Sequence, residues 1–576
     1  MSSNQTLSGT SETGRDKATW DHSEFNNNES SSGNSPRPQY QSQGTGISRP
    51  NIVRRKTKRV IGVVQPDGRR ELQEEECHDK LGFSYPWAKK WYILTVVFLV
   101  QLSMNFNSSV YSSSVHQITA KYAVSEAAAR CGQMIFLVSY AFGCELWAPW
   151  SEEYGRWPIM QLSLFFVNIW QIPAALSPNL GGLLVARFLG GLSSAGGSVT
   201  LGMCADMWES SDQGFAVAYV VLSSVGGSSL GPIFGGIIAD KLDLQWNFWI
   251  QMIFGVVVQV LHLLTVPETR SSILIDKEAA RRRKEGEDDN IYGPGTFRKG
   301  LSFNEVFTIW KRPFEMFLTE PIVLFLSLLS GFSDALIFIC MESVPLVFVQ
   351  WGFSSIAQGL IFCAIIIGYF IAYFLHLPDI ARQLKILKTD GEAARLAERR
   401  LLLLLFLAPL EPIGLFGFAW TSFGPSHSPW IAPVIFLTLI AIANFSIYMS
   451  TIDYMVAAYG PYSASATGGN GFSRDLLAGI AAMYAGPMYK KMSPSHPYQW
   501  ASTFLGLVAI VVAIPIYVFY WKGPEIRRRS KFAQTLAADK QLRREKSLRN
   551  FSEDEEEIEF DDLSPTPESS QPAHLA

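Results

Sequence analysis

The sequence of 576 residues lacks the features that identify several common classes of protein. Its eight histidines form no paired metal-ligand spacing and no GxxxxGKS/T segment is present, so we expect neither a metal site nor ATP-driven chemistry. No short apolar segment of the signal-peptide type precedes the first long apolar run, so the first helix is expected to direct membrane insertion. The cysteines are too few and too dispersed for a disulfide framework: Cys77, Cys131, Cys144, Cys204, Cys340 and Cys363. These features do not indicate an enzyme, and we expect no cofactor.

Charged residues make up 17% of the chain and are concentrated in its two ends and one central connection. Residues 1–85 and 522–576 are polar, and we expect both to be disordered tails because they have little apolar surface to bury. The middle is too apolar for a water-soluble domain. A helix that spans a membrane needs roughly 20 mostly apolar residues. We expect twelve such spans, beginning near Tyr92, Cys131, Pro158, Gly181, Gly214, Asn247, Glu320, Ile356, Leu401, Trp430, Tyr462 and Trp500.

The charge distribution predicts how these spans are arranged. The long basic connection 267–312 separates six spans in 86–266 from six in 313–521, which predicts an all-α membrane protein of two six-helix halves. Lys and Arg favour cytoplasmic loops. With both termini inside, connections 267–312 and 377–400 hold ten and six basic residues, whereas all outside connections hold five. We expect a multi-pass protein of the plasma membrane, rather than the vacuolar membrane, with both termini cytoplasmic. The charged run in 267–312 is interpreted as a solvated linker, with lipid binding as the alternative.

The short connection WSEEYGRWP (150–158) places charged residues between two apolar runs. Gly155 permits a tight reversal, and Glu152 and Arg156 are four residues apart, on one face of a helical turn. We expect these three residues to form a charged latch at the cytoplasmic mouth, present in one conformation and broken in another.

Five segments occur in an order that is typical of one family of carriers: WAPWSEEYGRWP (147–158), LVARFLGG (184–191), SVGGSSLGPIFGGI (224–237), PETR (267–270) and SASATGGNGFSRD (463–475). With them the chain resembles the major facilitator superfamily, specifically its fungal branch of twelve-span drug:proton antiporters, over residues 85–530. Gly155 and Arg156 match the family's G-x-x-x-D-x-x-G-R-K/R loop and Glu152 replaces its Asp, whereas Ala148 and Trp157 depart from it. The resemblance implies transport by alternating access.

Charged side chains within the spans are the candidates for coupling and substrate contact. The resemblance implies proton coupling by Arg187 in the fourth span, and in the eleventh it points to Arg474. Charges inside a bilayer are costly and normally face a polar cavity or a partner. Glu145, Asp334 and Glu411 are candidate proton carriers. The alternatives are structural: Arg187 held by carbonyls or a neighbouring Gln, and Asp334 or Glu411 paired with Arg474.

Two further features concern helix ends and helix packing. Glu342 and Asp453 lie near span ends, where we expect them to be solvated. The fifth span carries small residues about one turn apart, which we expect to pack tightly between the two halves and, at the proline, to bend the helix: Gly227, Gly231, Pro232, Gly235 and Gly236.

The sequence therefore predicts a proton-coupled secondary transporter that exports small amphipathic or cationic compounds, such as drugs, polyamines or fungal toxins. Its expected partners are the small-molecule substrate, protons and the lipid bilayer; no nucleic acid is expected, and the protein is expected to be monomeric. The antiporter-type fifth span favours export. Two alternatives remain: a proton-coupled uptake symporter, and a transporter-like sensor that signals through its tails.

Overall fold

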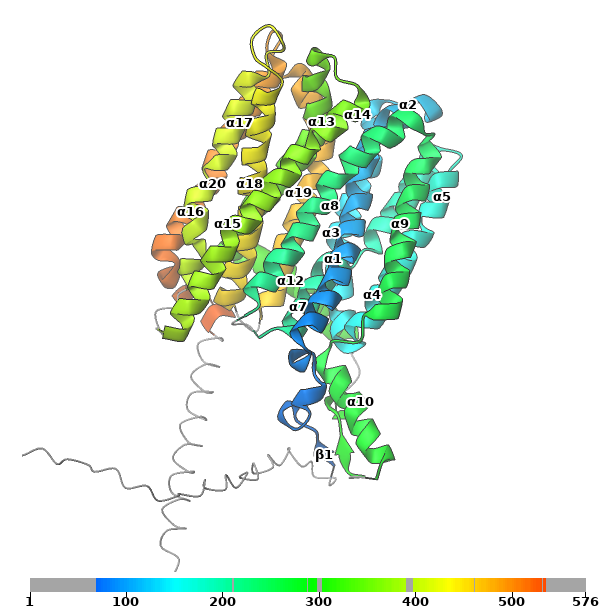
Figure 1. The fold of residues 1–576 in the computed structure, drawn as a ribbon, viewed down its shortest axis with the longest axis vertical. Helices are drawn as coiled ribbons and strands as arrows, with labels where there is room; N and C mark the ends of the chain where they lie inside the picture. The colour runs from blue at the N-terminus through cyan, green and yellow to red at the C-terminus, as the bar shows by residue number, and fades with distance from the viewer. Residues whose placement is uncertain are drawn as a thin grey trace, which may run out of the picture. The chain divides into compact units, whose positions relative to one another are not determined.

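The computed structural model describes residues 69–209, 212–286, 289–297, 303–389, 397–459, 462–530 and 532–534. Most of these residues form long α-helices (Figure 1). The N-terminal half comprises α1 (Trp87–Ser109), α2 (Val115–Tyr122), α3 (Glu126–Glu153), α4 (Arg156–Ile169), α5 (Gln171–Leu176), α6 (Leu180–Leu192), α7 (Gly196–Met207), α8 (Gly214–Lys241) and α9 (Leu244–Thr265). The connection holds α10 (Ser271–Lys284), α11 (Pro294–Phe297) and α12 (Phe303–Thr319). The C-terminal half comprises α13 (Pro321–Phe348), α14 (Ser355–Leu360), α15 (Phe362–Thr389), α16 (Leu402–Leu407), α17 (Leu410–Thr421), α18 (Ile431–Tyr459), α19 (Ser463–Lys491) and α20 (Pro497–Arg529).

The twelve expected spans correspond to these helices in two six-helix halves. Among the described residues, ten helical segments are long and apolar enough to cross a membrane. The two others are the fourth span, which is divided into α6 and α7, and the eleventh, α19, which is continuous but less apolar. At the division, the Ser163 hydroxyl donates to the Ser193 carbonyl (2.7 Å) and accepts from the Ala195 N–H (2.9 Å). Backbone groups freed inside a membrane need such partners, so α4 stabilises the break.

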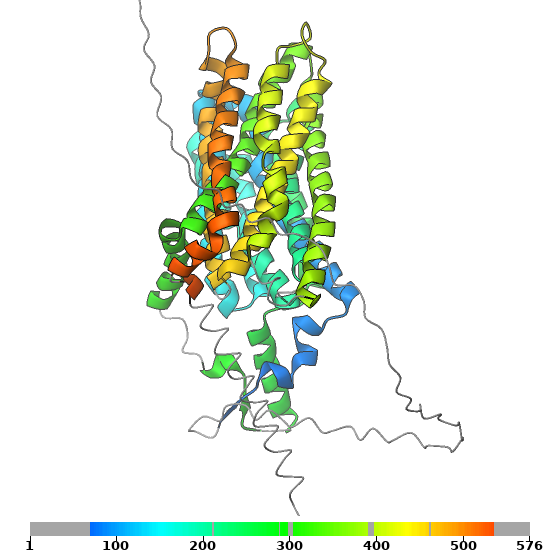
Figure 2. The ribbon, with the colours of Figure 1, turned by 90° about the vertical axis from the view of Figure 1, so that its left-hand side faces the viewer.

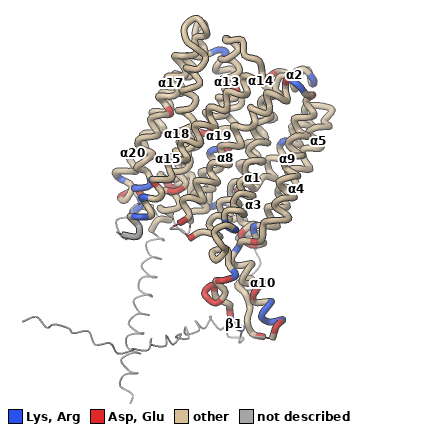
Figure 3. Tube along the Cα trace, viewed as in Figure 1, with Lys and Arg blue, Asp and Glu red and all other residues tan. Residues whose placement is uncertain are grey.

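The main contacts between the halves are made by α3 and α8 of the N-terminal half. The helix α3 packs along α19, and α8 packs along α14 and α15. Lys, Arg, Asp and Glu lie mainly at the helix ends and around α10, with few inside the bundle (Figure 3). The largest buried apolar cluster draws mainly on the C-terminal half and includes Phe338, Phe362, Phe418 and Phe445. The few charged side chains inside the bundle therefore need partners or a polar cavity to offset the cost of their burial.

A small folded unit, here called the clasp, lies outside the helical bundle beside the start of α1 (Figures 1 and 2). It consists of residues 70–84 and 271–297, and its strands β1 (Arg70–Glu71) and β2 (Ile291–Tyr292) pair in parallel. Its buried cluster is formed by Leu72, Cys77, Leu81, Ile275, Ala279 and Ile291. The prediction of a disordered tail through residue 85 is therefore wrong for residues 69–85. The predicted tail from residue 522 is likewise wrong at its start, because α20 continues to Arg529. Residues 1–68 and 535–576 lie outside the described residues. The charged run, for which the sequence allows a short helix within a solvated linker, forms the second part of α10. This helix is not a simple linker, because it buries apolar residues against the chain before α1.

A carboxylate stabilises the clasp through two arginines. Glu278 accepts hydrogen bonds from Arg281 (2.7 Å) and Arg282 (3.0 Å), and Arg282 also donates to the Glu76 carbonyl (3.0 Å). The Arg281 hydrogen bond is the main cause that lowers the Glu278 pKa to about 2. A carboxylate whose pKa is lowered by folding stabilises the folded state above its unfolded pKa and stops doing so as the pH falls through the folded value. This contribution is therefore fully present at neutral pH.

We expect Glu278→Gln to increase hydrogen–deuterium exchange of α10 severalfold at pH 7, because the two arginines lose their shared acceptor. The difference in α10 exchange between Glu278→Gln and the unchanged protein should become smaller as the pH falls toward 2, because Glu278 itself becomes protonated there. The control is Glu285→Gln, which removes a more exposed partner of Arg281. Equal exchange of the unchanged protein and Glu278→Gln at pH 7 would contradict this role.

Candidate functional site

Arg156 is the centre of a charged cluster at the end of the bundle that faces α10. Its guanidinium donates to Asp206 (3.0 Å) and to the Ser151 hydroxyl (2.6 Å), and both Arg156 and Asp206 are buried. The expected partner Glu152 is half-exposed, and its carboxylate lies 4.0 Å from Arg156. Arg156 therefore pairs mainly with Asp206, fifty residues away, because that carboxylate is both closer and shielded from water.

A second carboxylate fixes the turn before Arg156. Glu268 accepts hydrogen bonds from the backbone N–H groups of Arg156 (3.0 Å) and Trp157 (3.1 Å), at the start of α4. Gly155 has φ +103°, a conformation that favours glycine, and a side chain there would meet the Glu268 carboxylate. Arg270 reaches Asp206 at 3.4 Å. All these residues belong to the N-terminal half or follow α9 directly, so the cluster holds α3, α4 and α7 together rather than joining the two halves.

Arg187 on α6 is a buried cation that has no carboxylate partner among the described residues. Its guanidinium donates to the carbonyl of Gly132 (3.3 Å) and to the carbonyl and side-chain oxygens of Asn107 (both 3.2 Å). It also lies over the rings of Phe136 (4.0 Å) and Tyr111 (4.7 Å), and its Nη2 has no hydrogen-bond partner in the described part of the chain. Dipoles and aromatic faces therefore hold this charge, which leaves the Nη2 amino group available to donate to an electronegative atom.

The C-terminal half contains a buried ion pair. Asp334 on α13 accepts a hydrogen bond from Arg474 on α19 at 2.8 Å, and each side chain is less than 10% exposed. The Arg474 guanidinium also lies 3.4 Å from the ring centroid of Tyr448 on α18. Of the two pairings left open by the sequence, the structure contains Asp334 with Arg474, which joins three helices.

Glu411 on α17 lies apart from that pair. One carboxylate oxygen accepts a hydrogen bond from Ser333, whose hydroxyl also accepts from the Asn444 amide (3.2 Å). The other oxygen is buried and has no hydrogen-bond partner among the residues that the structure describes. Because Ser333 immediately precedes Asp334, the Glu411 network and the ion pair meet on one turn of α13.

Two acids lie where α3 faces α19. Glu145 is buried, and a side chain added at Gly468 would lie 2.5 Å from its carboxylate. Asp475 follows Arg474 and interacts electrostatically with Arg474, Asp334 and Glu145. Within the described residues, neither Glu145 nor Asp475 makes a hydrogen bond or ion pair through its carboxylate. Asp475 was not recognised as a candidate from the sequence, although it lies in the same motif as Arg474.

At the opposite end of the bundle an ion pair joins the two halves. Arg130 on α3 and Glu342 on α13 are 2.8 Å apart, and both are less than 10% exposed. Glu126 lies 3.3 Å from Arg130 and 2.7 Å from Lys490 on α19. The prediction that Glu342 is solvated is therefore wrong, because Arg130, more than two hundred residues away, compensates its burial. Asp453 is also paired, with Arg400.

The glycines of α8 have two different packing partners. A Cβ atom at Gly227 would lie 2.7 Å from the Leu102 carbonyl, and Gly231 and Gly235 similarly approach residues 109–113 after α1. Gly236 instead faces the other half, where its Cβ would lie 2.6 Å from the Ser355 carbonyl. The expected packing between halves therefore holds for Gly236, whereas the other three glycines pack α8 against its own half. The carbonyl of Pro232 also meets the other half, at Gly359.

We expect Gly236→Ala to reduce transport at least about fivefold, because the added methyl group must displace a backbone carbonyl of the opposite half. The matched control is Gly226→Ala on the same helix, where the nearest atom to the new methyl group is a Leu102 side-chain carbon at 3.7 Å. Transport at equal levels of folded protein is the measurement. Equal rates for the two variants would show that this contact does not limit transport.

Comparison with known proteins places this arrangement among carriers. A family model described as Major Facilitator Superfamily matches residues 97–483. The MFS-type transporter paaT of Penicillium rubens is 33% identical over 452 residues, which cover 78% of this chain and 81% of that protein. A cycloheximide resistance protein of Candida maltosa is 28% identical over 464 residues, or 78% and 83% of the two chains.

Solved structures show the same fold at low sequence identity. The proton:xylose symporter XylE of E. coli superposes with a TM-score of 0.50 at 17% identity, over 76% of this chain and 96% of that one. At this identity the similarity concerns the fold alone.

Proposed function

Because this chain belongs to the major facilitator superfamily, we propose that it is a proton-coupled secondary transporter that exports small amphipathic or cationic compounds. The names of its relatives support this choice of substrate class, since one of them confers resistance to cycloheximide. The family consists of transporters, so the chain moves its substrate across a lipid bilayer rather than converting it.

The observation that carries the proposal is a surplus of carboxylates inside the bundle, where Glu145 and Glu411 are buried and Asp475 is partly buried. Arg474 neutralises Asp334, whereas Glu145, Glu411 and Asp475 have no ion-pair partner within the described residues. A carboxylate buried without a cation can be satisfied by a proton or by a cationic ligand. Protons and a cationic substrate therefore compete for the same acids, which is the requirement for exchanging one for the other.

The arrangement of the ion pairs supports alternating access. The Arg156 cluster keeps the N-terminal half rigid, whereas the Arg130–Glu342 pair joins the halves at the end that we assign to the outside. Opening that end separates Arg130 from Glu342 and hydrates both. Arg187 donates hydrogen bonds to atoms of α1 and α3, so a relative movement of these two helices would change its contacts. We therefore assign Arg187 to coupling and Glu145, Glu411 and Asp475 to proton or cation binding.

The proposal includes the plasma membrane, cytoplasmic termini and a monomeric carrier. The excess of Lys and Arg in the connections 267–312 and 377–400 supports this orientation, since such loops remain on the cytoplasmic side. The clasp then lies in the cytoplasm.

The test is transport into inside-out membrane vesicles, with labelled cycloheximide and a polyamine as probes. An acidic lumen should drive accumulation of a transported compound, and collapse of the pH gradient should abolish it. Accumulation driven only by an alkaline lumen would identify an uptake symporter and contradict the proposal. Absence of transport of either probe, with tail-dependent signalling that persists, would favour the sensor alternative instead.

A further inference from the structure

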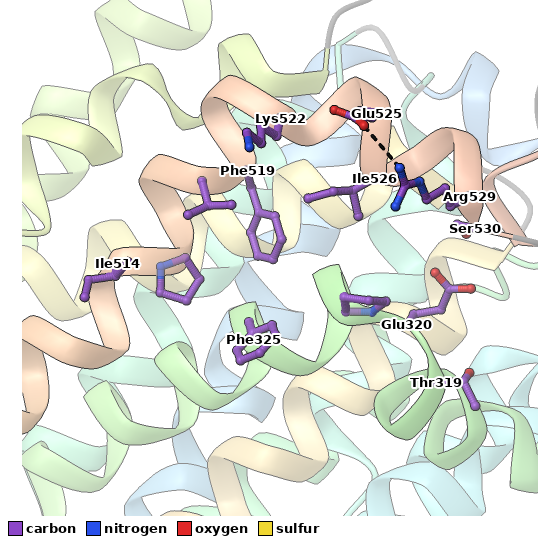
Figure 4. Close-up of a pocket in the computed structure, with 13 residues that line it drawn as sticks. Thr319, Glu320, Phe325, Ile514, Phe519, Lys522, Glu525, Ile526, Arg529 and Ser530 are labelled. Carbon is purple, nitrogen blue, oxygen red and sulfur yellow. Dashed lines mark hydrogen bonds and ion pairs between the residues drawn. The ribbon is translucent and has the colours of Figure 1, made fainter.

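A groove lies at the end of the bundle that faces α10, between the start of α13 and the last turns of α20. It encloses about 690 Å³. Figure 4 shows its lining side chains on these two helices and at the turn between α12 and α13. The lining residues are Thr319, Glu320, Pro321, Phe325, Ile514, Pro515, Val518, Phe519, Lys522, Glu525, Ile526, Arg529 and Ser530. Since α13 and α20 cross the membrane, the groove lies where the bilayer surface meets the protein.

The groove is apolar at one end and charged at the other. Phe325, Ile514 and Val518 line the part nearer the middle of the membrane, and each is at least 40% exposed. Lys522 and Arg529 follow on α20 toward its end, as Figure 4 shows. This order along one helix matches a ligand with a polar head at the membrane surface and apolar chains directed inward.

Lys522 and Glu320, a cation and a carboxylate that line the groove, have no ion-pair partner within the described ranges. Glu525 and Arg529 pair with each other at 3.2 Å. Lys522 forms no ion pair within the described residues. Glu320, which is only 5% exposed, accepts one hydrogen bond, from the Tyr459 hydroxyl at 3.2 Å. Because this one hydrogen bond comes from a neutral donor, a ligand ammonium group would add a stronger, charge-assisted hydrogen bond to the same carboxylate.

We propose that this groove binds a zwitterionic phospholipid with a primary ammonium head group, namely phosphatidylethanolamine, from the leaflet that faces α10. Its phosphate lies against Lys522, and its ammonium group donates hydrogen bonds to Glu320. The acyl chains follow Phe325 and Val518 into the membrane. The site concerns the surrounding lipid, so it depends on neither the direction of transport nor the transported compound.

Charge complementarity selects this head group over its alternatives. Phosphatidylcholine carries the same phosphate, but its quaternary ammonium group has no N–H to donate. Phosphatidylglycerol offers no cation to Glu320. Phosphatidylserine adds a carboxylate next to Glu320, and like charges disfavour that contact. The acidic tail segment EDEEEIEFDD (553–562) is disfavoured for the same reason.

The experiment is native mass spectrometry of the purified full-length protein, titrated with phosphatidylethanolamine, phosphatidylcholine and phosphatidylglycerol of identical acyl chains. We expect phosphatidylethanolamine to be retained about tenfold better than phosphatidylcholine, the effect of one charge-assisted hydrogen bond. Glu320→Gln should remove this preference, whereas Lys522→Gln should weaken the binding of both lipids, because they share the phosphate. Lys491→Gln, at the opposite end of the bundle, is the control.

A further variant separates loss of lipid binding from loss of folding, and three outcomes would contradict the proposal. Tyr459→Phe removes the hydroxyl that donates to Glu320 but keeps the carboxylate, so the preference should persist; this variant separates loss of the ligand contact from loss of folding. Equal retention of phosphatidylethanolamine and phosphatidylcholine by the unchanged protein would overturn the proposal. So would stronger retention of phosphatidylglycerol, which would indicate attraction to the basic helix end alone, or lipid binding that appears only after residues 535–576 are removed.

Discussion

Asp334→Asn is expected to reduce transport to background. The Asp334–Arg474 pair is buried, and its removal from one side leaves the Arg474 guanidinium without the acceptor that it contacts at 2.8 Å. Breaking a buried ion pair in this way typically costs about 3–5 kcal/mol. The variant should therefore be less stable as well as inactive, and the two effects must be separated by a second variant. Transport in vesicles and thermal stability of the purified protein are the two measurements.

The double variant Asp334→Asn with Arg474→Gln makes that separation. It removes both charges, so most of the lost stability should return, because no charge remains buried without a partner. Transport should not return if the pair belongs to the coupling machinery. Asp453→Asn is the matched control, since Asp453 also pairs with an arginine but lies at a partly exposed helix end. Full transport by the double variant would show that the pair is only structural.

Glu342→Gln is expected to shift the protein toward the conformation that is open at the end opposite α10. The Arg130–Glu342 pair is the buried ion pair that joins α3 to α13 at this end, and it can persist only while this end is closed. Loss of the ion pair should destabilise the closed conformation by about 3–5 kcal/mol. A change of about 5.5 kcal/mol would move the equilibrium between closed and open conformations from 99:1 to 1:99, so the expected destabilisation is large on this scale. The open conformation should therefore become a major population.

Distances between spin labels at Lys241 and Lys491, exposed positions at this end on the two halves, measure the shift. Glu342→Gln should increase the population with the longer distance. Glu126→Gln is the control, because Glu126 is half-exposed in the same cluster and its removal should leave the distribution nearly unchanged. An unchanged distribution in Glu342→Gln would show that the pair does not hold the halves together.

The sequence could identify buried charges but could not pair most of them. Arg187, Asp334, Glu411 and Arg474 were recognisable because a charged residue in a long apolar run needs an explanation whatever the fold. Among pairings, the sequence predicts that of Asp334 with Arg474 as one of two possibilities, and that of Glu152 with Arg156, which is present only as a long, half-exposed contact at 4.0 Å.

The partners that were missed lie far away along the chain. Glu152 was expected to pair with Arg156 because the two are one helical turn apart, but Asp206 is closer in space and better shielded. The sequence predicts a solvated Glu342 because nothing near it in the sequence indicates Arg130. Such contacts depend on how helices pack, which local patterns do not encode.

The same limit explains the boundary of the N-terminal tail. Residues 69–85 have a polar composition that favours disorder, yet Leu72, Cys77 and Leu81 are buried. Their partners lie on α10 and β2, about two hundred residues later. Segments of low apolar content can fold when a distant segment supplies the rest of a core.

The most direct test of proton-coupled export is proton movement in liposomes that contain the purified protein, an acidic lumen and a pH-sensitive dye inside. Addition of a transported compound outside should raise the luminal pH as protons leave in exchange for it, and Asp334→Asn should abolish that change. A luminal pH that stays constant while the compound accumulates, or that falls with it, would contradict exchange of protons for substrate.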